Sequence, residues 1–363
     1  MSFRQSPANR VDALIFSALS YISFGGSVEA MPEVPISLKD AAEEFFRLPD
    51  QAARCRVKTD LSLLMAAAET KRFGNTMLLQ YRSLLVPEEE TQFAAITFLL
   101  DDNTGMVTFR GTDYTLVGWK EDFNMTFQET IPAQRLAQQY TKEIGEKYIM
   151  PLQICGHSKG GNLAVFSAVK APEAVRNRIT TIYNHDGPGF TEFIMSDHNY
   201  RELIPKIQTI IPQSSVIGML LDHEEPYTII KSKQIGLLQH DPYSWELCGP
   251  DFVPMEEITS DSRFMNLTIR NWLAGMTNEE RNEVVDAVFE LLSIGDVDNV
   301  IDIIQPKNIG NYLRTLHANA KIRRILSDEL TSLIEAARKT QLELEEASNP
   351  KDPDVLQIPN HLT

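Results

Sequence analysis

Apolar residues follow a helical spacing near the start of the chain and then change to short runs typical of strands. Over residues 10–70, apolar positions three and four apart predict mainly helix, because such positions line one helix face. Examples are Val11, Leu14, Ile15, Ala18 and Leu19. Aliphatic and β-branched runs then predict three strands, at residues 77–86, 93–102 and 106–113. The tripeptide NTG at 103–105 separates the last two and predicts a tight turn or hairpin.

Strands and helices alternate from residue 133 to about residue 240. The predicted helices cover 133–148 and 162–171, and the predicted strands cover 151–155, 179–184, 207–212, 227–232 and 235–240. Strands that alternate with helices are joined by right-handed crossovers and form a largely parallel sheet. We therefore predict an α/β fold with a mostly parallel central sheet, preceded by an N-terminal helical segment.

From about residue 255 the pattern predicts helices again. Thr277 and Glu280 form a capping box that opens one of them. Its apolar stripe consists of Val284, Val285, Val288, Leu291 and Leu292. A further helix is predicted over 320–347, and three prolines in residues 348–363 predict a disordered tail.

This pattern divides the chain into a main domain over 1–254, a helical C-terminal extension over 255–347, and the tail over 348–363. The apolar stripe of the extension must be buried against something. We expect it to pack on the main domain or on a second copy of the chain in a homo-oligomer.

The charge of the chain excludes some kinds of partner. Its 363 residues hold 34 Lys and Arg against 50 Asp and Glu, a formal net charge of −16. A nucleic-acid binder needs a cationic surface to displace counterions from phosphates, so we expect no nucleic-acid partner. No run approaches the ~18 apolar residues of a transmembrane helix, and the N-terminus lacks the order of a secretory signal.

The cysteines and histidines give no sign of a metal site. Cys55, Cys155 and Cys248 are widely spread and form no C-x-x-C pair. We therefore expect neither a disulfide framework nor a cysteine-rich zinc site. The cysteines instead favour a protein of a reducing compartment. No two histidines have the H-x-x-x-H spacing. We predict a cytoplasmic protein that needs no metal and no cofactor.

One glycine-rich segment has the pattern of a catalytic nucleophile. The sequence CGHSKGGN at 155–162 contains G-x-S-x-G between a predicted strand and a predicted helix, which is the context of a nucleophile elbow. Gly156 and Gly160 allow a turn so tight that Ser158 presents its hydroxyl at a strained corner. The first N–H groups of the following helix favour negative charge at the same place. The alternative is a phosphate-binding turn, but the segment lacks G-x-G-x-x-G and the Walker spacing.

Several motifs in series carry a family resemblance. They are FRGTD (109–113), GHSKGGNLA (156–164), DGPGF (186–190), PQSS (212–215) and QHDPYSW (239–245). The first two resemble the fungal-type class 3 lipases of the α/β-hydrolase fold. The whole series more closely resembles a bacterial family of lipase-like α/β-hydrolases, over residues 8–250. The resemblance implies an α/β-hydrolase fold and a Ser-His-Asp triad.

His240 is the candidate for the general base. It opens the loop 241–245 just beyond the predicted strand 235–240, and the order Ser…Asp…His places the base on a late loop of this kind. It also matches the histidine of the family's QHDPYSW motif. The alternative is a surface-loop histidine held by local hydrogen bonds. His157 lies inside the elbow, and we interpret it as packing.

Asp186 and Asp222 are the candidates for the acid of the triad. Asp186 starts the DGPGF turn after the predicted strand 179–184, and this turn resembles the one that carries the aspartate in pancreatic-type lipases. Asp222 lies after the next strand, where class 3 lipases carry their acid, but this chain reads PQSSV in the corresponding stretch. We favour Asp186 and keep Asp222 as the alternative. Either could instead be a turn-forming aspartate.

The oxyanion hole needs two backbone donors aimed at the developing negative charge. One is expected to be the N–H of Lys159, the residue after the nucleophile. The resemblance to the lipase F-R-G-(S/T) turn implies Thr112 as the other. Class 3 lipases usually carry Leu at the position of Lys159. Its charge therefore either favours a polar or anionic substrate, or is solvated or held in a salt bridge.

Residues 113–132 follow this turn, where lipases of this type carry their lid. Trp119, Phe123 and Phe127 give the segment enough apolar surface to cover an acyl pocket. The sequence WKED at 119–122 also fits the family's W-x-x-D pattern, which is structural there. A mobile lid and a fixed cap are both compatible with these residues.

These residues predict a serine hydrolase, similar to a lipase or esterase, that cleaves the carboxylic ester of an acyl lipid or a small acyl compound. Ser158 would attack the carbonyl and form an acyl-enzyme, with His240 as base and Asp186 holding the imidazole. Two alternatives stay open. One is a non-catalytic hydrolase-like scaffold that binds a ligand or protein, and the other is a thioesterase or acyltransferase with the same triad.

Overall fold

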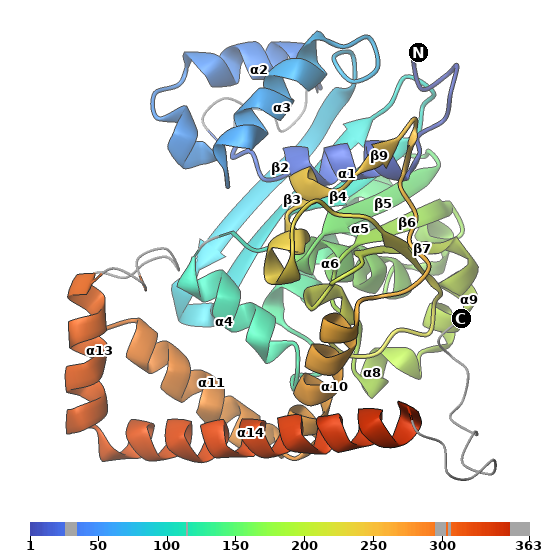
Figure 1. Cartoon of the computed structure of the whole chain (residues 1–363). Coiled ribbons are helices and arrows are strands. Elements are labelled where there is room, and N and C mark those ends of the chain that lie inside the picture. Colours follow the sequence, from blue (N-terminus) through green and yellow to red (C-terminus); the bar gives the residue numbers. More distant parts are fainter. Residues whose placement is uncertain (26–34, 114, 295–302, 304–305, 349–363) are drawn as a thin grey trace.

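One sheet forms the centre of the main domain (Figure 1). The computed structural model describes residues 1–25, 35–113, 115–294, 303 and 306–348. In this part of the chain eight strands lie side by side in chain order. They are β1 (Ile36–Ser37), β2 (Met77–Val86), β3 (Thr91–Leu99), β4 (Gly105–Phe109), β5 (Leu152–His157), β6 (Ile179–His185), β7 (Ile207–Pro212) and β8 (Tyr227–Ile230). The pairs from β1 to β4 are antiparallel and those from β4 to β8 are parallel.

Helices cover both faces of the sheet, and each face has its own apolar core. On one face lie α1 (Arg10–Leu19), α2 (Leu38–Arg47) and α3 (Lys58–Glu69), which form the predicted N-terminal helical segment. On the other face lie α5 (Pro132–Lys147) and α6 (Lys159–Val169). Successive side chains of a strand point to opposite faces, so Ile154 of β5 belongs to the α5–α6 core and Cys155 to the α1 core.

Short helices connect these elements. They are α4 (Leu116–Asn124), α7 (Glu173–Arg176), α8 (Glu192–Met195) and α9 (His198–Leu203). The 3-10 helices are η1 (Gln51–Arg54), η2 (Pro87–Glu89), η3 (Ile204–Lys206), η4 (Ile217–Met219), η5 (Gly236–His240) and η6 (Pro242–Ser244). A ribbon of two strands, β9 (Leu247–Cys248) and β10 (Asp251–Phe252), follows them.

The parallel strands end at one edge of the sheet, and this edge positions the candidate site. Phe109 of β4 pairs with Gly156 of β5, and His157 of β5 pairs with His185 of β6. The turns after these strands therefore leave the sheet together. Chain-ordered strands, a strand–turn–helix elbow at Ser158 and helices on both faces define an α/β-hydrolase fold, as predicted. No helix in the described ranges is long and apolar enough to span a lipid bilayer.

The prediction of a strand over 235–240 is wrong. This segment is the 3-10 helix η5, because Gly236 adopts a positive φ of 53°, which ends an extended run. The free edge of β8 instead meets residues 253–255, through the hydrogen bonds Lys231 N→Val253 O and Met255 N→Ile229 O, each 2.9 Å long. Ile235 of the misassigned segment is 79% exposed, as expected for a side chain without a sheet partner.

The C-terminal helices form an arm below the main domain in Figure 1. They are α10 (Ser260–Ala274), α11 (Asn278–Leu292), α13 (Pro306–Ala318) and α14 (Ala320–Ser348). The predicted capping box is present, with Glu280 N donating to Thr277 Oγ1 at 3.2 Å and Thr277 N donating to Glu280 Oε2 at 2.8 Å. Val285 and Phe289 of α11 pack with Leu116 of α4. The apolar stripe therefore contacts the main domain, one of the two arrangements expected from the sequence.

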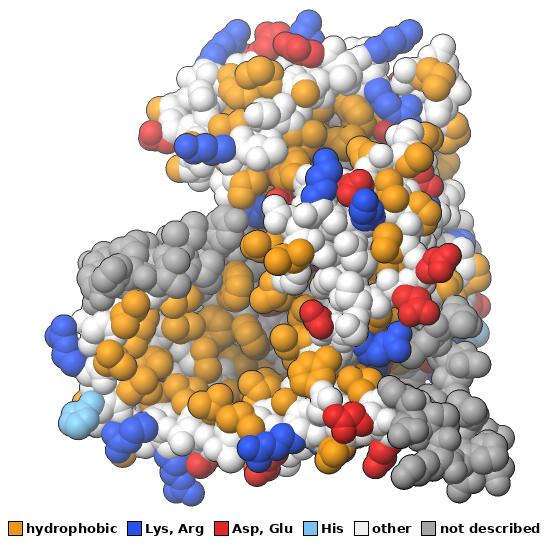
Figure 2. Space-filling view, viewed as in Figure 1, with side chains coloured by type: hydrophobic (Ala, Val, Ile, Leu, Met, Phe, Trp, Pro, Cys, Tyr) orange, Lys and Arg blue, Asp and Glu red, His pale blue; other side chains and the backbone are white. Residues whose placement is uncertain are grey.

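Some apolar side chains of the arm lie at the surface. Figure 2 shows orange side chains gathered on the hollow side of the arm, facing the main domain. Leu313 of α13 and Leu330 and Leu342 of α14 are among the exposed apolar residues. Assembly through these helices stays a prediction. The predicted tail, apart from Ser348, lies outside the described residues.

Candidate active site

Ser158 occupies a tight turn between β5 and α6. Its backbone has φ 60° and ψ −136°, a conformation that non-glycine residues rarely adopt and that stores strain. The glycines on either side are required by close packing. A Cβ on Gly156 would lie 2.0 Å from Gly160 O, and one on Gly160 would lie 2.3 Å from Phe109 O. The structure therefore has the elbow expected from G-x-S-x-G.

Asp186 and His240 lie together at the same edge. Asp186 is the first residue after β6, where it starts the turn with a φ of 51°, and it is buried. His240 Nδ1 donates to its Oδ2 at 2.7 Å. The other carboxylate oxygen accepts from Ser215 Oγ at 2.5 Å and from Gly218 N at 3.2 Å. These donors on the carboxylate hold the acid in one orientation.

Asp222, the alternative acid, lies elsewhere. Its carboxylate pairs with Arg270 of α10, and its side chain is about half exposed. Its backbone pairs with Phe190 in an isolated bridge. The structure therefore brings Asp186, and not Asp222, to His240.

His240 rests on the ring of His157, with ring centroids 4.6 Å apart. His157 Nε2 donates to the carbonyl oxygen of His240 at 2.8 Å, and its Nδ1 lies 3.1 Å from the Tyr21 hydroxyl. Burial lowers the pKa of His157 well below its usual range. His157 thus has the packing role expected for it. Its uncharged ring lies against the ring of His240 and puts no positive charge beside it. Tyr21, which follows the C-cap of α1, had no signal in the sequence.

The turn after β4 approaches the elbow closely enough to require glycine. A Cβ on Gly111 would lie 2.4 Å from His157 O and 3.0 Å from Ser158 Cβ. Thr112 follows it, and its hydroxyl donates to Asp122 Oδ1 at 2.7 Å. Burial raises the pKa of Asp122 to about 6, although Lys159 and the Thr112 hydroxyl oppose this rise. Thr112 thus directly follows the residue that packs against the elbow of Ser158.

The side chain of Lys159 is buried and fully paired. Its Nζ donates to Glu121 Oε2 at 2.7 Å and to Gln92 O and Oε1 at 2.9 Å each. Of the expectations for this charge, the salt bridge is the one realised. Glu121 was not a candidate from the sequence. The available signal was the lysine itself, because a cation in a buried elbow needs a counter-charge.

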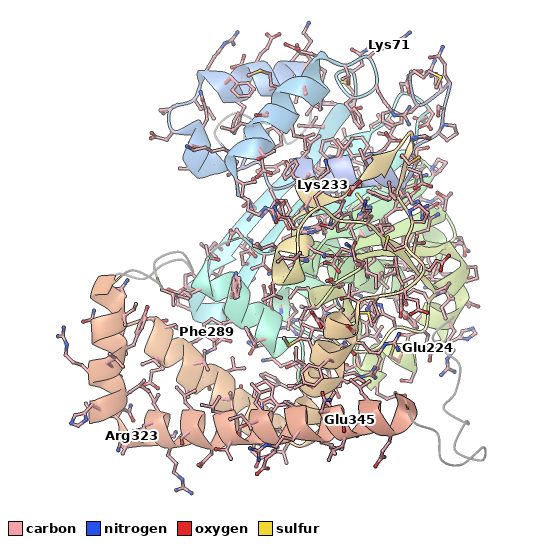
Figure 3. All side chains as sticks on the ribbon, viewed as in Figure 1. Lys71, Glu224, Lys233, Phe289, Arg323 and Glu345 are labelled. Atoms are coloured by element: carbon pink, nitrogen blue, oxygen red, sulfur yellow. The ribbon has the colours of Figure 1, made fainter. Side chains whose placement is uncertain are left out.

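Trp119 and Phe123 lie on the exposed side of α4, and Phe127 follows the end of this helix. Trp119 and Phe123 are 42% and 46% exposed. Phe123 packs edge to face on Phe289 of α11, with ring centroids 5.9 Å apart, and Figure 3 labels Phe289 where α11 lies next to α4. Phe127 packs against the same cluster. The acidic residues Glu121 and Asp122 face the elbow instead.

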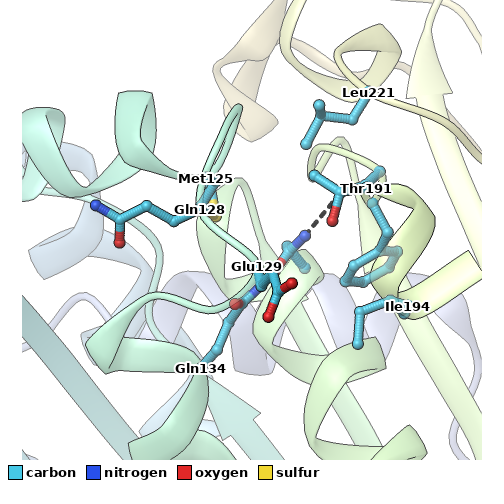
Figure 4. A pocket seen from close by; sticks show the side chains of 10 residues that line it. Met125, Gln128, Glu129, Gln134, Thr191, Ile194 and Leu221 are labelled. Carbon is cyan, nitrogen blue, oxygen red and sulfur yellow. Dashed lines mark hydrogen bonds between the residues drawn. The ribbon is translucent and has the colours of Figure 1, made fainter. Parts of the chain in front are cut away.

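A small cavity lies beside the elbow, between the end of α4 and α8 (Figure 4). Its volume is about 10 Å³, room for about one water molecule and not for an acyl chain. It is lined by Met125, Gln128, Glu129, Gln134, Asn162, Gly189, Phe190, Thr191, Ile194 and Leu221. Asn162 spans it with a hydrogen bond to Gly189 O at 2.9 Å. Over the described residues, no group of three or more His, Cys, Asp or Glu is placed to hold a metal ion.

His185, next to Asp186, makes the stability of this edge depend on pH. It is buried, and burial lowers its pKa from 6.5 to about 4. Between these values the unfolded chain binds a proton that the folded chain excludes. The free energy of unfolding should therefore fall as the pH drops from 6.5 to 4, by at most about 3 kcal/mol from this group. Denaturant unfolding at pH 7.5 and 4.5 measures this change. Between these pH values the free energy of unfolding of His185→Gln should fall less than that of the wild type. His198→Gln, an exposed control, should match the wild type, and equal losses in all three would contradict the assignment.

The model of the Mbeg1-like family matches residues 67–290. This range contains the five sequence motifs, the residues Ser158, Asp186 and His240, and most of α11. The recognition of a lipase-like α/β-hydrolase family from those motifs is confirmed. The comparison with curated proteins finds no match.

Several solved lipase structures are distantly similar. The Rhizomucor miehei lipase in its propeptide complex is 13% identical, with a TM-score of 0.39 over 70% of this chain and 75% of that one. A mutant form of MDLA from Penicillium cyclopium is 14% identical, with a TM-score of 0.39 over 69% of this chain and 87% of that one. A triacylglycerol lipase from Penicillium expansum is 10% identical, with a TM-score of 0.34 over 62% and 82%. With TM-scores below 0.5, these structures carry no argument about this chain.

Proposed function

The chain belongs to the Mbeg1-like family, and we propose that it is a serine hydrolase that cleaves a carboxylic ester. The proposal is carried by one observation, the hydrogen bond of 2.7 Å between His240 Nδ1 and Asp186 Oδ2 beside the elbow of Ser158. That bond leaves the proton of a neutral imidazole on Nδ1 and the lone pair on Nε2. A histidine in this tautomer can take a proton from a serine hydroxyl.

The reaction would proceed in two halves. Ser158 Oγ attacks the acyl carbonyl carbon while His240 Nε2 takes the hydroxyl proton. The backbone N–H groups of Lys159 and Thr112 stabilise the oxyanion. His240 then gives the proton to the leaving alcohol, and the acyl group stays on Ser158. Water, deprotonated by His240, repeats the sequence and releases the acid.

Backbone strain at Ser158 favours an enzyme over a binding scaffold. A positive φ at a non-glycine residue costs of order 1–3 kcal/mol, and a serine that only packs would gain nothing in return. The same residues would also serve a thioesterase or acyltransferase. A thioester is therefore the second substrate to assay, with a second alcohol as an added acceptor.

A fluorophosphonate probe tests the nucleophile directly. The wild type and Ser83→Ala, an exposed serine of β2, should both be labelled and hydrolyse p-nitrophenyl esters. Ser158→Ala should show no labelling and a loss of kcat of at least about 10⁴-fold. Equal labelling of Ser158→Ala and the wild type would disprove the proposed function.

A further inference from the structure

Two consecutive acidic residues of α4 each hold one of the residues proposed to form the oxyanion hole. Glu121 binds the side chain of Lys159, and Asp122 accepts the hydroxyl of Thr112. Thr112 and Lys159, the two proposed oxyanion donors, lie 47 residues apart in the sequence. Helix α4 joins them from one side, so its position bears on the geometry of both.

The pair Lys159–Glu121 is buried and has its hydrogen bonds satisfied. Both side chains are 0% exposed. Lys159 Nζ donates three hydrogen bonds, one to the Glu121 carboxylate and two to oxygens of Gln92. The Glu121 carboxylate also accepts from Gln92 N at 3.1 Å and from Ala133 N at 2.9 Å. Through this carboxylate, α4 is tied to β3, to the start of α5 and to the first residue of α6.

Moving α4 away from the elbow would separate this pair. Breaking a buried ion pair leaves an uncompensated charge and is strongly destabilising. The outer side of α4 is held as well, because Lys120 pairs with Glu90 and with Asp286 of α11 at 2.7 Å each. The aromatic contact between Phe123 and Phe289 adds to this. Helix α4 is thus anchored on both sides.

We propose that Glu121 is a positioning residue which, through Lys159, keeps the oxyanion hole assembled in the resting enzyme, and that α4 is a fixed brace. A lid must leave its place before an ester can react, whereas a brace does not. The substrates are then acyl esters dissolved as single molecules, and a lipid–water interface adds nothing to the rate. This inference rests on the proposed ester hydrolysis.

The first test separates positioning from folding. The double variant Lys159→Met/Glu121→Leu replaces the buried pair with apolar side chains, a change that proteins often tolerate. Its kcat on p-nitrophenyl butyrate should fall about 10- to 100-fold while KM stays within about twofold, because the hole acts in the transition state. Lys170→Met, which breaks the pair of Lys170 with Asp197 at the other end of α6, should leave kcat unchanged. A double variant with the wild-type unfolding midpoint and wild-type kcat would overturn the proposal.

The second test uses the wild type and does not depend on any variant folding. The rate should level off once p-nitrophenyl butyrate reaches its solubility limit, because the concentration of dissolved ester no longer rises there. A sharp increase in rate at that point would overturn the brace. Amide hydrogen exchange in α4 should be as slow as in α6, because both open only with the core. Fast exchange confined to α4 would also overturn it. If the wild type hydrolyses no ester and takes no fluorophosphonate, the proposed function fails, and amide exchange alone decides whether α4 is fixed.

Discussion

Asp186→Asn should lower kcat by about 10⁴-fold and leave the fold intact. An amide at this position can accept or donate, so it no longer requires the proton of His240 to stay on Nδ1. The wrong tautomer then faces Ser158, which is the cause of losses of this size in serine hydrolases. The amide oxygen can still accept from Ser215 and Gly218, so the turn keeps its shape. Steady-state hydrolysis of p-nitrophenyl butyrate and a denaturant unfolding curve measure the two parts of this prediction.

Asp222→Asn is the matched control. Its carboxylate pairs with Arg270 at the surface, where an ion pair contributes at most about 1 kcal/mol. Its kcat should stay within about twofold of the wild type. A loss of about 10⁴-fold in Asp222→Asn, with Asp186→Asn near the wild type, would reverse the choice of acid.

Local patterns predicted most of the fold. Helices with regular apolar spacing and the strands β2 to β8 lie close to where their sequences indicate, because burial of one face is decided within each segment. The short strand β1 had no signal and lies within the stretch 10–70, which was predicted as mainly helix. The failure at 235–240 has a different cause. An apolar run next to a strand suggested its partner, but residues 253–255 bond to that edge. Which of two segments pairs with the edge of a sheet depends on the path of the whole chain. Within the segment itself, the positive φ of Gly236 is the feature that prevents an extended strand.

The candidate site also has parts that local sequence predicts and parts that depend on distant segments. The elbow could be predicted because its glycines and serine are adjacent in the sequence. Asp186 was favoured over Asp222 only by the resemblance of its turn, since the geometry depends on where the loop 240–245 meets the sheet edge. The pairing of Lys159 with Glu121 joins residues 38 positions apart. The aromatic residues of α4 suggested a cover for an acyl pocket, yet Phe123 faces α11, an element much later in the chain.

The C-terminal arm contacts the candidate site through two helices. Ser262 and Asn266 of α10 donate to the carbonyl oxygens of Ser215 and Met219. These carbonyls belong to the loop that orients Asp186 through Ser215 Oγ and Gly218 N. Helix α11 covers α4 with Phe289, which is only 6% exposed. The arm therefore supports both the loop around Asp186 and the proposed brace.

A chain that ends at residue 254 should consequently lose at least about 99% of its activity or fail to stay in solution. Removing the arm exposes the apolar side of α4, at about 25 cal/mol for each Å² of apolar surface, and frees the loop at 215–219. A chain that ends at Ser348 retains the contacts of α10 and α11 and is the control. Both chains are compared by fluorophosphonate labelling, ester hydrolysis and the unfolding midpoint. A stable 1–254 fragment with wild-type kcat would show that the arm is a separate module, and the support of Asp186 would then have to come from Ser215 and Gly218 alone.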